Sequence, residues 1–334
     1  MRFDFKFDVN KLSHLRTVGK VGKIFFPTNA DEVQQAYMYT KENDLQPFPL
    51  GNGSNTLIGY LEKIVLVSDR KLHSSFWGEA YPTQIARDIL GEESRTSKKR
   101  LEIVSIGCEG DGKLILSASI NINLIIMHAL RLGLGGLEFL AGIPANLGGL
   151  ICMNAGANGR TISEFVEWVD LVNEDGETRL LFKDIEFGYR HSKINGFIIR
   201  ACLRLNSVDK ETHYQVIKTA VAKRKAKQPL TMPNLGCYFK NPTLPSYKGE
   251  GMDCHVPLNL SQKGNESAGY LIEQAGLKSF KIGGAMISPL HANFLVNTGG
   301  AKFEDFIALA EYIKGVVNDK FSIMLQEEVK VING

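Results

Sequence analysis

The sequence predicts an α+β protein of two or three domains. At 334 residues the chain is longer than one ordinary hydrophobic core supports. Segments that alternate apolar and polar residues, as strands do, are mixed with segments whose apolar residues recur at helical spacing. Glycines also gather in two loops, residues 51–56 and 133–159, which predicts backbone that approaches a ligand closely.

Composition excludes several classes of protein. Hydrophobic residues make up 44% of the chain and charged residues 22%, as in soluble globular proteins. The net charge of +3 comes from 39 basic and 36 acidic residues that are interspersed, so we expect no nucleic-acid partner. Five scattered cysteines without a CxxC pair argue against a disulfide framework, and seven histidines without HExxH argue against a metal site. With no apolar run of membrane-span length and no signal core, we expect no membrane insertion and a cytoplasmic protein. The oligomeric state is not predicted, and a monomer is compatible with the sequence.

The first part, residues 1–68, reads as strand, helix and strand around the first glycine loop. Residues 23–27 form a short apolar strand. A helix begins near Asp31, where Thr28 or Asn29 can cap it and acidic residues suit its dipole. Residues 48–50 then lead into the loop, and residues 64–67 form a buried strand.

The second part, residues 69–210, contains mostly strands. Residues 91–100 are polar and read as an exposed loop, and residues 101–106 and 113–118 alternate as a hairpin. A helix is expected over residues 123–132, closed by Gly133. Strands follow at 166–172 and 197–203, with a turn at 174–176.

The third part, residues 211–334, mixes helices and strands. A helix near residues 209–227 connects it to the second part. Residues 268–276 read as a helix closed by glycine, residues 294–297 as a strand, residues 303–317 as an amphipathic helix and residues 323–332 as a closing strand.

The first glycine loop follows a strand and consists of Gly51, Asn52, Gly53, Ser54, Asn55 and Thr56. Successive backbone N–H groups in such a turn can surround an anion, and the polar side chains add donors, so a pyrophosphate is the natural occupant. The loop is neither GxGxxG nor a Walker motif, which excludes the Rossmann and P-loop readings. Taken alone, it is equally compatible with a plain tight turn.

The second glycine loop strengthens the ligand reading. Eight glycines fall between residues 133 and 159, more than a turn requires. Backbone folded against a flat ring and a diphosphate explains this density, and Asn154 could bond a polar ring edge. Packing of the loop onto a neighbouring helix is the alternative. The candidate cofactor-binding residues here are Gly142, Ile143, Pro144, Ala145, Asn146, Gly148, Gly149, Asn154, Gly156 and Ala157.

A third motif, residues 234–242, is a small-residue turn that carries the acidic thiol of Cys237, followed by Lys240 and Asn241. The two glycine loops indicate a flavin bed, and the three motifs together indicate a reductase.

In this order the motifs resemble the UDP-N-acetylenolpyruvoylglucosamine reductases, also called UDP-N-acetylmuramate dehydrogenases. The segments that carry the likeness are residues 135–144, 148–149, 153–157, 188–192, 228–230, 236–242 and 325–329. The likeness extends from about residue 18 to the C-terminus. It implies a vanillyl-alcohol-oxidase-type module with non-covalent FAD, and a C-terminal α+β substrate domain. It also implies reduction of UDP-N-acetylglucosamine enolpyruvate to UDP-N-acetylmuramate by NADPH, for peptidoglycan synthesis.

The resemblance implies three catalytic residues. In the family reaction, hydride from reduced FAD reaches C3 of the enolpyruvyl group and an acid protonates C2. Arg190 is the expected partner of the charge that develops on the substrate carboxylate. Glu328 matches a second stabilising group, which must act through hydrogen bonding because a bare carboxylate would repel the enolate. Cys237 takes the place of the serine that donates the proton in familiar members, and a thiol can serve because its reference pKa is about 8.5.

Further implied contacts and departures concern the substrate and the adenine. Lys240 and Asn241 match positions near the substrate diphosphate, and Lys227 is a weaker candidate. The N-terminal family motif is altered around residues 13–14 and 19–20, which leaves the adenine contacts open. The short run from Arg190 to the strand at residue 197 resembles the shorter, second type of the family. Two alternatives stay open: an FAD-dependent alcohol or sugar oxidase of the same fold, and an inactive flavin- or nucleotide-sugar-binding protein.

Overall fold

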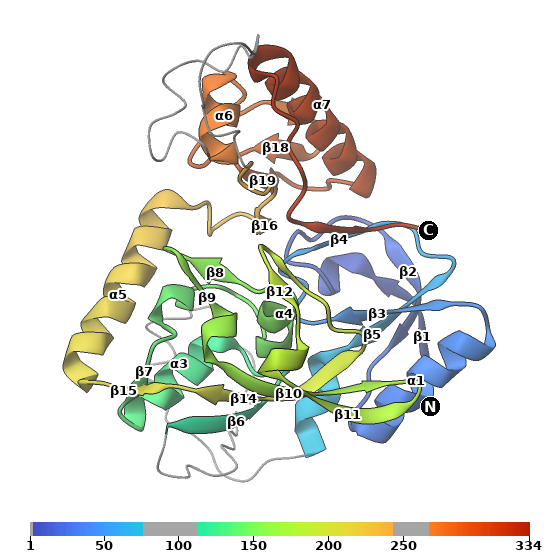
Figure 1. Ribbon diagram of the computed structural model, residues 1–334. Coiled ribbons are helices and arrows are strands. Elements are labelled where there is room, and N and C mark those ends of the chain that lie inside the picture. Colours follow the sequence, from blue (N-terminus) through green and yellow to red (C-terminus); the bar gives the residue numbers. More distant parts are fainter. Residues whose placement is uncertain (1–2, 76–111, 243–266) are drawn as a thin grey trace, which may run out of the picture. The chain divides into compact units, whose positions relative to one another are not determined.

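The computed structural model describes residues 3–75, 112–242 and 267–334, and its helices and sheets divide into two compact units of interleaved segments (Figure 1). Unit 1 comprises Met1–Phe5, Lys23–Asn52 and Lys63–Ala226. Unit 2 comprises Lys6–Gly22, Gly53–Glu62 and Lys227–Gly334. The predicted polar loop at 91–100 and the strand at 101–106 lie outside the described residues. The three-part division at residues 68 and 210 stays a prediction.

A partly parallel sheet fixes the position of the first glycine loop. Its strands run in the order β1 (Phe3–Asp8), β2 (Lys20–Phe25), β5 (Ile64–Ser68) and β3 (Gln46–Leu50). Strand β5 pairs in parallel with both β2 and β3, so the residues that follow β3 and β5 emerge at the same edge. Helix α1 (Ala30–Glu42) begins where predicted, with the Asn29 side chain accepting from the Glu32 backbone N–H.

The second sheet of unit 1 is antiparallel. Its strands run in the order β11 (Gly176–Leu181), β10 (Val166–Asn173), β14 (Phe197–Arg204) and β6 (Lys113–Ser117). The remaining elements of this part are α3 (Ile122–Arg131), α4 (Leu147–Cys152), α5 (Lys210–Lys227) and the short pairs β7 (Leu134–Gly135) with β15 (Asn206–Ser207), β8 (Gly156–Ala157) with β9 (Arg160–Thr161), and β12 (Phe187–Gly188) with β13 (His191–Ser192). The predicted helix at 123–132 is confirmed, and Gly133 closes it with a φ of 74°. Helices α3 and α4 pack with β6 and β14 in one apolar core.

Asp170 ties three strands of the antiparallel sheet together. It lies opposite Arg179 on β11 and Arg200 on β14, and it binds their Nε atoms at 2.7 and 3.0 Å. Its carboxylate is almost fully buried, whereas the two guanidinium groups reach solvent. The pairing therefore satisfies a charge that would be costly to bury alone.

We expect Asp170→Asn to lower the free energy of unfolding by about 1–3 kcal/mol, because the hydrogen bonds that its carboxylate accepts from two guanidinium groups are weakened. Urea denaturation would measure the change. Glu186→Gln is the control, since Glu186 pairs with Lys193 and both side chains are more than 60% exposed. That variant should stay within about 0.5 kcal/mol of the parent. Equal effects of the two substitutions would contradict the assignment.

Unit 2 combines a small sheet with two helices. The strand order is β16 (Asn234–Cys237), β19 (Phe294–Asn297), β18 (Ala285–Ile287) and β17 (Lys281–Ile282). Helices α6 (Ala268–Gln274) and α7 (Phe303–Phe321) share its apolar core, and β4 (Thr56–Ile58) pairs in parallel with β20 (Lys330–Ile332). Strand β4 and strand β20 are more than 270 residues apart in the sequence, so unit 2 is completed by the N-terminal part of the chain.

Two predicted boundaries are wrong in unit 2. The amphipathic helix runs past residue 317 to Phe321, where Ser322 ends it in a left-handed conformation. The closing strand expected over 323–332 is confined to Lys330–Ile332, apart from one bridge between Glu327 and Phe239. Leu325 and Val329 are buried, so the apolar pattern there reflects packing of extended chain rather than sheet pairing. Among the described helices, none combines the length and the apolar character needed to cross a membrane.

Candidate active site

The two glycine loops meet at one edge of the parallel sheet in unit 1. The Asn52 side chain, just beyond β3, donates from Nδ2 to the Pro144 carbonyl at 2.7 Å. The Asn146 side chain donates from Nδ2 to Oδ2 of Asp69, just beyond β5, at 2.8 Å. Residues 92 and 77 positions apart are therefore joined by two side-chain hydrogen bonds. The structure brings together Asn52, Pro144 and Asn146, which the sequence assigned to one cofactor site.

Asn123 holds the second loop from behind. It is buried in the first turn of α3, donates to the Ile143 carbonyl at 2.9 Å and accepts from the Gly142 N–H at 2.6 Å. Gly142 has a φ of 83°, a conformation that favours glycine. The sequence analysis did not identify Asn123, because its role depends on the contacts that its buried amide makes with the second loop.

The glycines of the second loop serve two purposes. A Cβ at Gly148 would press against Ala118, which follows strand β6, so this glycine permits close packing of α4 against the sheet rather than of a loop against a neighbouring helix. A Cβ at Gly149 would meet no described atom within 4 Å, so packing does not explain that glycine. Open space beside the Gly149 backbone is compatible with close approach of a ligand.

Arg190 lies in a tight hairpin. Strands β12 and β13 pair directly across the Tyr189–Arg190 turn, and Arg190 has a φ of 61°, which is uncommon for a residue with a side chain. Its Nη2 donates to the Gly156 carbonyl at 3.0 Å, and Asn154 Nδ2 donates to the Gly188 carbonyl at 3.0 Å. The predicted catalytic arginine is thus tied to the predicted cofactor loop.

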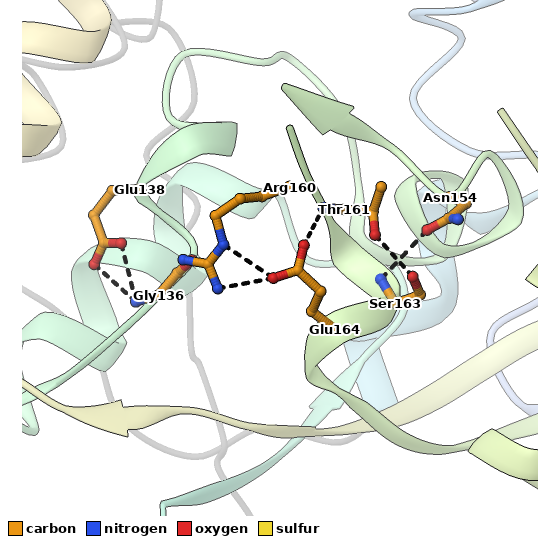
Figure 2. A network of polar contacts seen from close by, with 7 residues as sticks. All are labelled: Gly136, Glu138, Asn154, Arg160, Thr161, Ser163 and Glu164. Atoms are coloured by element: carbon orange, nitrogen blue, oxygen red, sulfur yellow. Dashed lines mark hydrogen bonds and ion pairs between the residues drawn. The ribbon is translucent and has the colours of Figure 1, made fainter. Parts of the chain in front are cut away.

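A polar network joins residues between Asn154 and Glu164, the segment that contains Gly156, and Figure 2 shows it. Arg160 binds Glu164 at 3.0 Å and lies over the Phe165 ring, 4.9 Å from its centroid. Glu164 also accepts from the Thr161 N–H at 2.6 Å. Desolvation acts to raise the pKa of Glu164, but the bonds from Thr161 and Arg160 outweigh it and lower the pKa. Ser163 donates its N–H to Asn154 Oδ1 at 3.4 Å, so the network reaches the residue that holds the Arg190 hairpin.

Cys237 and Glu328 lie on neighbouring backbone segments of unit 2. The Glu328 N–H donates to the Tyr238 carbonyl at 2.8 Å, and the Lys240 N–H donates to the Gln326 carbonyl at 2.8 Å. Both Cys237 and Glu328 are half-buried. Residues about 90 positions apart are therefore held in one cluster by backbone hydrogen bonds.

The buried side chain of Asn293 and the half-buried side chain of Lys314 anchor these two segments. The Asn293 amide binds both the N–H and the carbonyl of Phe239, at 2.9 and 2.8 Å. On the other segment, Lys314 of α7 binds Glu327 at 2.8 Å. Neither Asn293 nor Lys314 was predicted as part of the site.

The second half of the first glycine loop belongs to unit 2. Asn55 Nδ2 donates to the Glu328 carbonyl at 3.3 Å, and the Asn55 carbonyl accepts from the Lys330 N–H at 3.0 Å. Gly53 has a φ of 68°, and a Cβ there would overlap the Leu12 carbonyl. Asn55 therefore links the predicted cofactor loop to the predicted catalytic glutamate.

The three substrate-binding candidates are placed differently. Asn241 Oδ1 accepts from the Ala268 N–H at 3.2 Å at the start of α6. Lys240 is half-buried next to it in sequence, whereas Lys227 is exposed at the end of α5. Lys240 and Asn241 thus lie on the same segment as Cys237, and all three assignments stay predictions.

Comparison with known proteins identifies the family. The chain is 31% identical over 341 residues to a protein from Chloroherpeton thalassium named UDP-N-acetylenolpyruvoylglucosamine reductase, covering 99% of this chain and 94% of that protein. This chain belongs to the UDP-N-acetylenolpyruvoylglucosamine reductase family. A Bacillus subtilis reductase of the same name is 31% identical, with 95% of this chain and 89% of that protein covered. Residues 228–332 match the sequence profile of the C-terminal domain of these reductases.

A solved structure confirms the predicted fold class for this reductase. The crystal structure of UDP-N-acetylenolpyruvylglucosamine reductase from Thermus caldophilus matches over all of both chains, with a TM-score of 0.70 and 25% identity. The resemblance inferred from the motifs is therefore confirmed at the level of the family and of the fold.

Proposed function

We propose that this reductase converts UDP-N-acetylglucosamine enolpyruvate to UDP-N-acetylmuramate, with FAD as bound cofactor and NADPH as co-substrate, in the cytoplasm. The observation that carries the proposal is the pairing of the Cys237 and Glu328 segments through the Glu328 N–H and the Tyr238 carbonyl. It supports the proposal because the residues expected to donate the proton and the stabilising hydrogen bond lie on paired segments of a chain that belongs to the reductase family.

The residues present fit a flavin cofactor. The loops joined by Asn52 and Asn146 present small residues and backbone N–H groups, and Gly149 faces open space. The residues that would hold FAD are Gly51, Asn52, Gly53, Ser54, Asn55, Thr56, Gly142, Ile143, Pro144, Ala145, Asn146, Gly148, Gly149, Asn154, Gly156 and Ala157. Bound FAD would supply the transfer of hydride from NADPH to the substrate.

The chain's own side chains supply the remaining chemistry. The Cys237 thiol would donate the proton to C2 of the enolpyruvyl group, and it is half-buried rather than sealed in the core. Glu328 would stabilise the developing enolate by donating a hydrogen bond. Arg190 would pair its guanidinium with the substrate carboxylate as charge develops there. Lys240 and Asn241 would bind the diphosphate, with Lys227 as a further candidate.

We expect the purified protein to be yellow and to release FAD on denaturation. Without oxygen, NADPH should bleach the flavin absorbance, and the enolpyruvyl nucleotide sugar should restore it. Bleaching by an alcohol or a sugar would instead indicate an oxidase, and bound flavin that NADPH does not bleach would indicate an inactive binding protein. A colourless protein that takes up no flavin on reconstitution would contradict the proposal.

A further inference from the structure

A buried carboxyl group lies where the two glycine loops meet. Asp69 follows β5, and its residue surface is 5% exposed. Its Oδ2 accepts from Asn146 at 2.8 Å, but Oδ1 has no hydrogen-bonding partner among the described residues. A buried polar atom without a partner is costly and rare in native proteins, so this one requires an explanation.

The surroundings of Asp69 place its carboxyl group beside the proposed cofactor loops. A Cβ on Gly51 would lie 3.6 Å from Asp69 Oδ2, so the carboxyl group faces the backbone of the first glycine loop. Figure 1 shows β3 and β5 side by side, and their parallel pairing brings Gly51 and Asp69 to the same edge. Sequence reasoning gave Asp69 no role.

The pKa of Asp69 lies near neutrality. Burial raises its pKa to about 7, and the opposing effects of the Asn146 hydrogen bond and the Arg70 charge are smaller. Gly51, Asn52 and Asn146 bring no ionisable side chain to it, so Arg70, on its own segment, is the charged neighbour that acts on it. Near neutral pH both the acid and its anion are therefore accessible.

We propose that Asp69 Oδ1 binds a hydroxyl group of the flavin cofactor, on its ribityl chain or its ribose. The inference rests on the proposed function, because it takes the glycine loops as the flavin site. A phosphate oxygen accepts hydrogen bonds but does not donate, so it could pair only with the protonated acid. A hydroxyl group donates and accepts, and it pairs with the carboxyl group in either state.

This chemistry predicts the sign of a pH dependence. A hydroxyl that donates to the ionised carboxylate stabilises the anion, so binding lowers the pKa of Asp69 and releases a proton. FAD affinity should then rise as the pH increases through about 7. A phosphate partner would hold the proton on Asp69, and FAD affinity would fall over the same range.

Two substitutions separate a binding role from a structural one. Asp69→Leu removes the unpartnered oxygen but also the hydrogen bond from the half-buried Asn146, and these two effects on stability oppose each other, so the unfolding temperature of the flavin-stripped full-length chain should change little. Its affinity for FAD, measured from flavin fluorescence released on dilution of the holoenzyme, should fall by about 10- to 100-fold. Asp69→Asn can still donate to a hydroxyl, so it should lose less affinity but lose the pH dependence.

Asp170→Asn is the matched control, since Asp170 is also a buried carboxylate of unit 1 but binds Arg179 and Arg200. It should lower the unfolding temperature and leave FAD affinity unchanged. FMN identifies the source of the hydroxyl, because FMN carries the ribityl chain but not the adenosine ribose. If Asp69→Leu weakens FMN and FAD binding equally, the hydroxyl is ribityl; if it weakens FAD binding alone, the hydroxyl belongs to the ribose.

Several results would overturn the inference. If Asp69→Leu bound FAD as tightly as the parent, the inference would be wrong but the proposed function would stand. The same would hold if the FAD affinity of the parent fell as the pH rose. Parallel loss of stability and of FAD affinity in both Asp69 variants would assign the residue a structural role. A parent chain that binds no flavin would overturn the proposed function and this inference together.

Discussion

Replacing Cys237 by alanine is expected to slow the transfer of reducing equivalents to the enolpyruvyl substrate by about 10²- to 10⁴-fold, the usual contribution of a general acid. FAD should stay bound and NADPH should reduce it at the parental rate, because in the proposed mechanism the thiol takes part only in protonation of C2. Stopped-flow absorbance of the flavin would separate the two half-reactions. Cys237 lies on β16, and the hydrogen bonds from Asn293 and Glu328 to the backbone that follows it do not involve the replaced thiol, so the fold should stay intact.

Cys237→Ser is the matched control for this prediction. A hydroxyl group in the same place can donate the proton, so this variant should keep substantial activity. The parent should be sensitive to alkylating agents and protected by substrate, because a thiolate is the reactive form, whereas the serine variant should resist. If Cys237→Ala with FAD bound turned over substrate at the parental rate, the proton would have to come from another group or from water.

Local patterns predicted many elements but not the way they assemble. The spacing of Val33, Ala36 and Tyr37 and the capping residue Asn29 placed α1, because a helix face and a cap are encoded within a few residues. The pairing of β4 with β20 leaves no such trace, since it depends on contacts across most of the chain. Residues 51–56 were predicted as one loop, because the division between the units also depends on distant contacts. In the structure Asn52 belongs to unit 1 and Gly53 to unit 2.

The candidate site likewise contains residues that local patterns identified and residues that they did not. Glycine density located the cofactor loops, and the family motifs located Arg190, Cys237 and Glu328. These two signals do not identify Asp69, Asn123 or Asn293, because each is a polar residue that lies outside the glycine loops and the family motifs. Their significance comes from the topology: Asp69 matters because β5 lies beside β3, and Asn293 because its amide spans the backbone of Phe239.

The Arg190 hairpin presents a guanidinium group at a fixed place on a constrained backbone. The turn is two residues long, Arg190 has a φ of 61°, and Nη2 bonds the Gly156 carbonyl. Such a conformation is costly for a residue with a side chain and persists where the surrounding structure imposes it. A preorganised cation loses little entropy when charge develops beside it, which is the condition under which electrostatic stabilisation is most effective.

We expect Arg190→Ala to slow flavin reoxidation by the enolpyruvyl substrate by about 10²- to 10³-fold, the typical loss when one preorganised donor is removed, while NADPH reduces the flavin as before. Arg190→Lys should restore little, because an ammonium group lacks the planar fork that matches a carboxylate.

Arg190→Gly is the matched control for the backbone. Glycine adopts the positive φ without strain, so this variant should be more stable than the alanine variant but equally slow. Recovery of the rate in the glycine variant, or equal losses in both half-reactions, would mean that Arg190 shapes the hairpin rather than stabilising the substrate carboxylate.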